Sequence, residues 1–125
     1  MPTPLLQACP VYLDLDLALS QIGDTDAMNS MLLMLQESLA SDVPAIAVLL
    51  QQGDVAAANR LLHALKGFIP IFCPEPLCAH VVRVEGMSKH GAHPALEPAY
   101  AVLQPQLVLL RSEVEAYLQA HGMAA

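Results

Sequence analysis

The chain has 125 residues, of which 55% are apolar, 14% charged and only 4% aromatic. This composition excludes an intrinsically disordered chain, and the length suffices for one domain with a real core. Leu, Ala, Val and Met must fill that core, so helix-on-helix packing is favoured over a sheet.

Charge is unevenly distributed along the chain. The net charge is −7; residues 1–59 contain seven acids and no Lys or Arg, whereas residues 60–125 contain five of each sign. Because no basic patch is available to neutralise phosphates, nucleic-acid binding is not expected. The first two cations in the chain, Arg60 and Lys66, lie on either side of His63.

The N-terminal residues 1–10 contain three prolines and are predicted to form an extended arm, followed by one domain over residues 11–122. The first residues lack the charged and apolar regions of a secretory signal. No uninterrupted apolar run approaches the roughly 18 residues of a membrane span, and three cysteines do not make a disulfide framework. We therefore expect a cytoplasmic protein with no membrane partner.

A short helix is predicted over residues 12–22. Its inward residues are expected to be Leu13, Leu17 and Ile22, with Asp14 and Asp16 in solvent. Gly23 is expected to end this helix, and Asp24 or Thr25 can cap the next one.

The next segment has apolar residues at three- and four-residue steps, which is the helical pattern. These residues are Met28, Met31, Leu32, Leu35 and Leu39. Ser41-Asp42 and Pro44 are signals for a new helix start, so the segment up to Gly53 is either one bent helix or two.

A further helix is predicted to begin at Gly53-Asp54, which is a helix stop followed by an N-cap. Its apolar stripe consists of Ala58, Leu61, Leu62, Leu65, Ile69 and Phe72. His63 lies roughly 160–200° around the helix from that stripe, so its side chain is expected to be exposed. Pro70 is expected to kink the helix after Lys66 or Gly67.

Cys73-Pro74-Glu75-Pro76 predicts a turn, followed by a helix that contains Leu77, His80, Val81, Val84 and Met87. Gly86 and residues 88–93 are predicted to form a polar loop. A last helix is expected from about Glu97-Pro98 to Gly122, with a bend at Pro105; its stripe is Leu103, Leu107, Leu110, Val114 and Tyr117 or Leu118. The elements together predict an all-α fold, an antiparallel (up-down) four-helix bundle with a short extra N-terminal helix.

The residues that commonly bind metals do not form a recognisable site. Cys73, Cys78 and His80, with His90 or His93, fit none of the usual zinc-ligand spacings, so no metal is expected. No Cys has the neighbouring cation of an activated thiolate, and phosphate-loop and hydrolase motifs are absent from the sequence.

His63 is the remaining candidate for chemistry. A neutral imidazole is a competent nucleophile near pH 7 and can carry a phosphoryl group. Such a group brings a charge of roughly −2, which Lys66 at position i+3 can stabilise. Gly67, at i+4, has no side chain where a partner must approach, and a glycine within a helix costs about 1 kcal/mol relative to alanine.

The stretch His63-Ala64-Leu65-Lys66-Gly67 matches the H-x-L-K-G signature of histidine-containing phosphotransfer (HPt) domains. The resemblance extends over most of the chain. The segment Leu15…Ala18-Leu19 resembles the first helix of the family, and Gly53-Asp54 stands at the usual position before the histidine helix. Val84-Glu85 and the final Leu/Glu-rich helix resemble the segments that follow.

The resemblance implies a bundle that accepts a phosphoryl group on His63 and exchanges it with the aspartate of a response-regulator receiver domain. A hybrid sensor histidine kinase is the other partner that it implies. Such a domain is a phosphoryl carrier rather than an enzyme, and it has no cofactor of its own because the receiver supplies Mg²⁺. Lys66 would then stabilise the phosphoryl group and Gly67 would give clearance. Arg60, Asn59 and Phe68 are expected on the docking surface, although they are not part of the signature.

Two alternatives remain open at the level of sequence. Phe68, Pro70 and Cys73 depart from the small residues and the glycine that the family usually has after the signature. A degenerate member would dock to a receiver or kinase without carrying phosphate. An unrelated helical bundle that serves as an oligomerisation module would also fit the high apolar content.

Overall fold

The computed structural model describes residues 10–90 and 94–122. In these ranges the chain is helical and contains no strand, which confirms the all-α prediction. The elements in chain order are α2 (Leu15–Ile22), α3 (Thr25–Gln51), α4 (Val55–Phe68), the 3-10 helix η1 (Ile69–Ile71), α5 (Glu75–Ser88) and α6 (Leu96–Ala120). The predicted arm lies outside the described residues apart from Pro10, as does His93.

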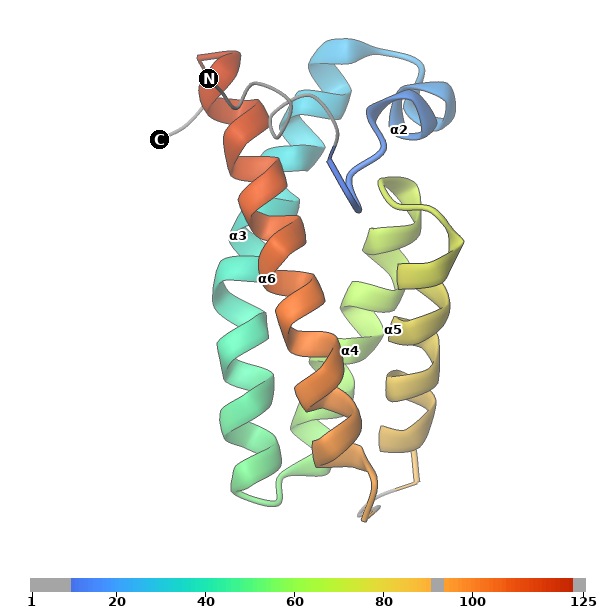
Figure 1. The fold of residues 1–125 in the computed structure, drawn as a ribbon, viewed down its shortest axis with the longest axis vertical. Helices are drawn as coiled ribbons and strands as arrows, with labels where there is room; N and C mark the ends of the chain where they lie inside the picture. The colour runs from blue at the N-terminus through green and yellow to red at the C-terminus, as the bar shows by residue number, and fades with distance from the viewer. Residues whose placement is uncertain (1–9, 91–93, 123–125) are drawn as a thin grey trace.

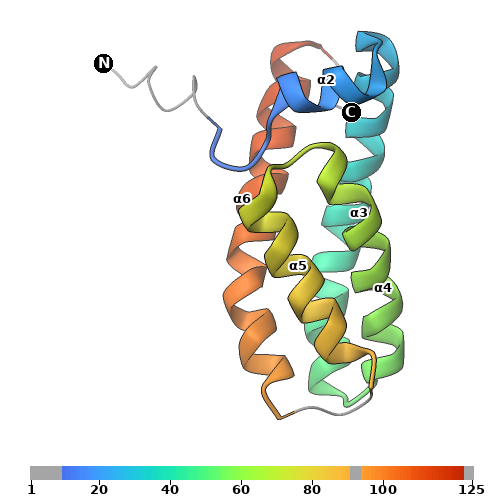
Figure 2. The ribbon, with the colours of Figure 1, turned by 90° about the vertical axis from the view of Figure 1, so that its right-hand side faces the viewer.

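The helices α3, α4, α5 and α6 run along the long axis of the molecule, and α2 lies over the ends of α4 and α5, beside α3 (Figures 1 and 2). Contacts join α3 to α4, α4 to α5, α5 to α6, and α6 back to α3. This closed ring of contacts places α4 and α5 side by side, and the candidate site described below lies on these two helices.

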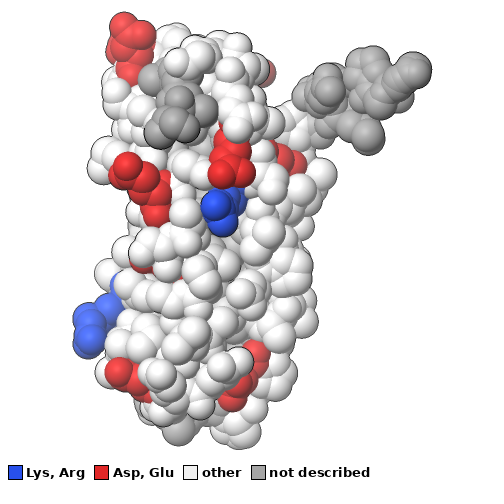
Figure 3. All heavy atoms as spheres, turned by 90° about the vertical axis from the view of Figure 1, so that its left-hand side faces the viewer, with Lys and Arg blue, Asp and Glu red and all other residues white. Residues whose placement is uncertain are grey.

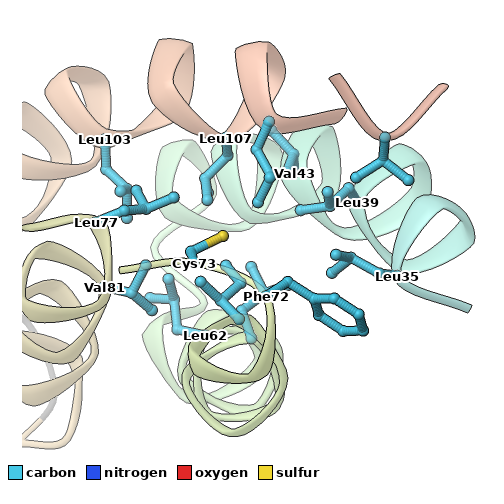
Figure 4. Close-up of a cluster of buried hydrophobic side chains, with 14 of the residues drawn as sticks. Leu35, Leu39, Val43, Leu62, Phe72, Cys73, Leu77, Val81, Leu103 and Leu107 are labelled. Carbon is cyan, nitrogen blue, oxygen red and sulfur yellow. The ribbon is translucent and has the colours of Figure 1, made fainter. Parts of the chain in front are cut away.

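The core between these helices is built from the predicted apolar stripes. On α4, on η1 and directly after η1, the buried residues of the stripe are Ala58, Leu62, Leu65, Ile69 and Phe72. Figure 4 shows Leu62 and Phe72 packed toward residues of α3 such as Leu35 and Leu39. Burial of these side chains fixes the rotation of α4 about its axis, because burying one large aliphatic side chain contributes about 1.5–3 kcal/mol.

α3 is one continuous helix of 27 residues with Pro44 inside it, so the alternative of two helices is wrong. Pro44 is exposed. The residues that flank it in the apolar stripe, Val43 and Ile46, are buried. Packing of this stripe outweighs the backbone hydrogen bond that the proline removes.

α3 is also the one helix in the described ranges that is long and apolar enough to cross a membrane. Of its most apolar 18-residue window, 28% is buried inside the structure, and the core helix of a water-soluble protein passes the same test of length and composition. Length and composition therefore do not decide between the two settings, and the cytoplasmic location stays a prediction.

The first helix begins at Leu15 rather than at Tyr12, because Asp14 is its N-cap and accepts a hydrogen bond from the Leu17 amide. The sequence predicts a solvated Asp14, but its side chain caps α2. The three residues before Asp14 are not helical, and their backbone amides all donate to the carboxylate of Glu113 on α6. Gly23 ends α2 with a φ of 84°, and Asp24 caps α3, both as predicted.

α5 extends further than the sequence predicted. Gly86 and Ser88 belong to the helix, so the polar loop predicted around them begins only at Lys89. The buried residues Leu77, Val81, Val84, Glu85 and Ser88 hold this last turn in place. α6 runs as one helix from Leu96 to Ala120, and the predicted stripe is buried with Leu118 rather than Tyr117 as its last member.

Candidate functional site

His63 lies in the middle of α4 on its solvent side, and 67% of its side chain is exposed. The start of α4 is defined by Gly53, which has a φ of 79°, and by the N-cap Asp54, whose carboxylate accepts from the Ala57 amide. The regular helix ends at Phe68, two residues before Pro70. Local sequence signals therefore place the imidazole on a regular, well-anchored turn.

The imidazole faces a carboxylate that belongs to the neighbouring helix. His63 Nδ1 lies 3.6 Å from Oε2 of Glu85, on α5. Only 2% of the Glu85 side chain is exposed, so a buried acid stands beside an exposed histidine. The distance is within ion-pair range but longer than a hydrogen bond.

Two lysines hold the other oxygen of the same carboxylate. Lys66 Nζ lies 3.1 Å from Glu85 Oε1, and Lys89 Nζ lies 3.7 Å from it. The Lys66 contact joins α4 to α5, whereas Lys89 reaches back by one turn of helix. Lys66 is the more enclosed of the two, with 26% of its side chain exposed against 50% for Lys89.

Asn59 completes the surroundings of the carboxylate from the turn of α4 before His63. Its Nδ2 donates to Glu85 Oε2 at 3.1 Å and to Ser88 Oγ at 2.8 Å. Ser88 Oγ in turn donates to the carbonyl oxygen of Glu85 at 2.7 Å. A buried carboxylate is costly unless its lone pairs are satisfied, and this network satisfies them.

The surroundings of Glu85 favour its ionised form. Desolvation by burial acts to raise the pKa of this carboxyl group. The hydrogen bonds from Lys66 and Asn59, with the charges of Lys66 and Lys89, outweigh desolvation, and the pKa lies below the ordinary value of 4.5. At neutral pH, His63 therefore faces a fixed negative charge.

Of the other residues expected at the site, Gly67 and Arg60 lie on the same side of α4 as His63, whereas Phe68 does not. Gly67 is exposed, and a Cβ built on it would have no atom within 4 Å, so the surface beside His63 is open there. Arg60 is exposed and lies on the same side of α4 as His63, about 60° around the helix. Phe68 lies about 140° around the helix from His63, and its ring packs against Phe72 with centroids 5.6 Å apart. The structure thus brings Asn59, Lys66 and His63 together around Glu85 and leaves Phe68 apart.

Glu85 was not among the residues expected at this site, and neither were Ser88 and Lys89. A signal was present, because Glu85 follows Val81 by four residues and Leu77 by eight, which places it on the buried side of α5. Glutamates are mostly exposed, so the acid was left out of the predicted stripe. Its partners Asn59 and Lys66 lie 26 and 19 positions away, and only the packing of α4 on α5 brings them together.

Cys73, Cys78 and His80 have partners outside the cluster around Glu85. Cys73 is buried, and burial raises the pKa of its thiol far above the ordinary value. Cys78 Sγ donates to the carbonyl oxygen of Cys73, and His80 Nδ1 lies 2.8 Å from Gln106 Oε1. In residues 10–90 and 94–122, no three His, Cys, Asp or Glu side chains form a group that could hold a metal ion.

No protein-family model, curated protein or solved structure matches this chain. A functional assignment therefore depends on the residues themselves: the motif on α4 and the charged cluster that the fold builds around Glu85.

Proposed function

We propose that this chain is a histidine phosphotransfer protein of the HPt type, an antiparallel four-helix bundle that carries a phosphoryl group on His63. In this proposal it exchanges the group with the aspartate of a receiver domain in a phosphorelay. The observation that carries the proposal is the contact between exposed His63 and buried, ionised Glu85, with Lys66 on the same carboxylate. A structural surface histidine does not need a buried counter-charge.

The contact with Glu85 supports different roles for the two ring nitrogens of His63. A proton on Nδ1 faces the carboxylate, which leaves the lone pair of Nε2 free on the solvent side. Nε2 attacks the phosphorus of an aspartyl phosphate; the N–P bond forms, and the P–O bond breaks with its electron pair on the departing carboxylate. The ring keeps its Nδ1 proton and becomes positive, and Glu85 stabilises that charge.

The distance of 3.6 Å between Nδ1 and Oε2 leaves room for this contact to tighten. His63 is largely exposed, so its ring is free to turn toward the fixed carboxylate as positive charge develops. Hydrogen bonds of catalytic groups are commonly long before the partner arrives and shorten in the reacting complex.

Lys66 supports the phosphoryl group in this scheme. Long side chains on a helix lean toward the N-terminus, so a lysine at i+3 leans back toward His63. A phosphoryl group of about −2 charge on Nε2 would compete with Glu85 for this ammonium group. Lys89 remains on Glu85, so the carboxylate keeps a cation when Lys66 turns toward phosphate.

The catalytic groups and the Mg²⁺ are assigned to the partner receiver, which makes this chain a phosphoryl carrier rather than an enzyme. A hybrid sensor histidine kinase is the alternative partner, and the cytoplasm is the proposed location. The alternative of a docking protein that carries no phosphate was motivated by Phe68 and Pro70. The ring of Phe68 packs against Phe72, and His63 remains largely exposed, which favours the carrier.

The proposal is tested by incubating the chain with a receiver domain that has been phosphorylated with radiolabelled acetyl phosphate. We expect acid-labile label on the wild type and none on His63→Gln. His121→Gln is the matched control, because His121 is also exposed but lies at the far end of α6. Equal labelling of wild type and His63→Gln, with both variants folded, would overturn the proposal.

A further inference from the structure

The exposed face of α4 around His63 carries no carboxylate. Its exposed residues between Val55 and Pro70 are Ala56, Arg60, His63, Ala64, Gly67 and Pro70. The chain as a whole has 12 acids and five cations, so this face differs in sign from the net charge of the protein. The face that α3 presents, by comparison, carries scattered carboxylates and few cations (Figure 3).

Arg60 differs from the other cations near the site because no acid of the described chain neutralises it. Lys66 and Lys89 pair with Glu85, and Arg111 pairs with Glu115. Arg60 has no ion pair within residues 10–90 and 94–122, although it stands one helical turn from His63. A cation left unpaired in an acidic protein is available to a partner.

The direction of the arginine side chain decides which group it serves. Long side chains lean toward the N-terminus of their helix, so Lys66 leans toward His63 while Arg60 leans away from it. The positive charge of Arg60 therefore lies further along α4 from His63. At that position the guanidinium group is not expected to contact a phosphoryl group on Nε2 of His63. Its position suits an acid on the surface of a docked protein.

We propose that Arg60 is a specificity-determining residue that attracts acidic side chains of the partner to the face of α4 around His63. These acidic side chains form a rim around the phosphoaspartate of the partner. This inference depends on the proposed function, because it names the surface chemistry of the receiver that exchanges phosphate with His63. A phosphoaspartate site that holds Mg²⁺ needs further carboxylate oxygens as ligands, so its rim is acidic. A chain of charge −7 would repel such a rim unless the docking face were locally positive.

The expected effect lies in the association step and depends on salt. Charges at the rim of an interface mainly change the association rate, and ions screen them over about 8–10 Å at physiological strength. For Arg60→Glu we expect the second-order rate of transfer from receiver to fall about tenfold at low salt. At about 0.5 M salt the difference should shrink to about twofold.

The matched control is Arg83→Glu, which makes the same change in net charge. Arg83 is exposed and has no ion pair in the part of the chain that the structure describes. It lies about 200° around α5 from Glu85, away from the His63 side. We expect Arg83→Glu to leave the transfer rate within about twofold of wild type, and Arg60→Lys to keep most of it.

The experiment measures phosphoryl transfer from a phosphorylated receiver at several receiver and salt concentrations. Loss of second-order rate in Arg60→Glu alone, with an unchanged rate at saturating receiver, supports the proposal. Equal losses in Arg60→Glu and Arg83→Glu would show an effect of net charge only and would overturn it. No loss in Arg60→Glu, or a loss confined to the saturated rate, would overturn it as well.

A second readout separates this inference from the proposed function. Binding of the unphosphorylated chain to the receiver, followed by fluorescence anisotropy, needs no transfer chemistry. If wild type binds but takes up no label, the carrier function fails while the role of Arg60 is still decided by binding. We expect about tenfold weaker binding for Arg60→Glu at low salt, and binding equal to wild type would overturn the inference.

Discussion

Lys66 and Glu85 form an ion pair of 3.1 Å that joins α4 to α5 directly beneath His63. The pair gives the lysine of the motif a structural partner in the absence of phosphate. It also keeps the carboxylate charged at a distance of 3.6 Å from the imidazole. The same contact thus links the stability of the helix pair to the charge that His63 faces.

Glu85→Gln should destabilise the fold even though it preserves the shape of the side chain. The change removes a charged acceptor from Lys66 and Asn59, and hydrogen bonds to charged groups contribute about 1.5–3 kcal/mol each. Both lysines can regain water because they are partly exposed, so we expect a net loss of about 1–2 kcal/mol in urea unfolding at pH 7. Glu37→Gln, on the exposed side of α3, should change stability by less than about 0.5 kcal/mol.

The stabilisation from Glu85 should disappear in acid. Its pKa in the folded state lies below the ordinary value of 4.5, so the unfolded chain binds the proton more readily. The contribution of the Glu85 carboxylate to the free energy of unfolding is therefore fully present above about pH 4.5. It is lost as the pH falls through the lower pKa that Glu85 has in the folded state. Unfolding free energies of wild type and Glu85→Gln, measured between pH 7 and pH 3, should converge on the acid side. A constant difference over that range would contradict this account.

Asn59→Asp should be more harmful than Asn59→Ala at neutral pH. The alanine variant loses the amide donor to Glu85 and Ser88, at a cost of about 1–2 kcal/mol. The aspartate variant adds a second carboxylate beside the first, and like charges in one site disfavour ionisation of both. Thermal unfolding should rank the aspartate variant below the alanine variant at pH 7, with the gap closing near pH 4. Reversed order at pH 7 would show that Asn59 does not act as a donor to a charged acid.

Gly67→Ala should separate stability from function. The added methyl group meets no atom within 4 Å, so helix propensity alone should stabilise the fold by about 0.5–1 kcal/mol. The methyl group stands one turn from His63, where a docked partner needs space, so phosphoryl transfer should fall. Gly86→Ala, in an equally open helical position on α5, should bring similar stabilisation with normal transfer. Normal transfer in both variants would show that clearance at Gly67 is not required.

The order of helices and the exposure of His63 could be predicted from local signals. Apolar periodicity and the Gly-Asp pair at 53–54 locate α4 and its buried stripe, and Pro70 locates its end. The continuity of α3 could not be predicted, because Pro44 and the capping residues before it favour a break when read locally. Burial of Val43 and Ile46 on the two sides of the proline overrides that preference.

The charged cluster around Glu85 could not be predicted from the sequence, for a different reason. Periodicity can place Glu85 on the inner side of α5, but it cannot show that Asn59, Lys66 and Lys89 surround the acid. The motif gives Lys66 a role beside His63 and leaves Arg60 outside the signature, but it does not show which carboxylate either cation contacts. The structure distinguishes them, since Lys66 pairs with Glu85 and Arg60 does not.

The most direct test of the central claim is to locate the phosphoryl group on the protein. We would label the chain with ¹⁵N, phosphorylate it with a phosphorylated receiver, and record the ring nitrogens and ³¹P by NMR. The account predicts phosphorus bonded to Nε2 of His63, with the proton retained on Nδ1 toward Glu85. Phosphorus on another residue or on Nδ1 of His63, or no phosphorylation by any receiver that binds the chain, would contradict it.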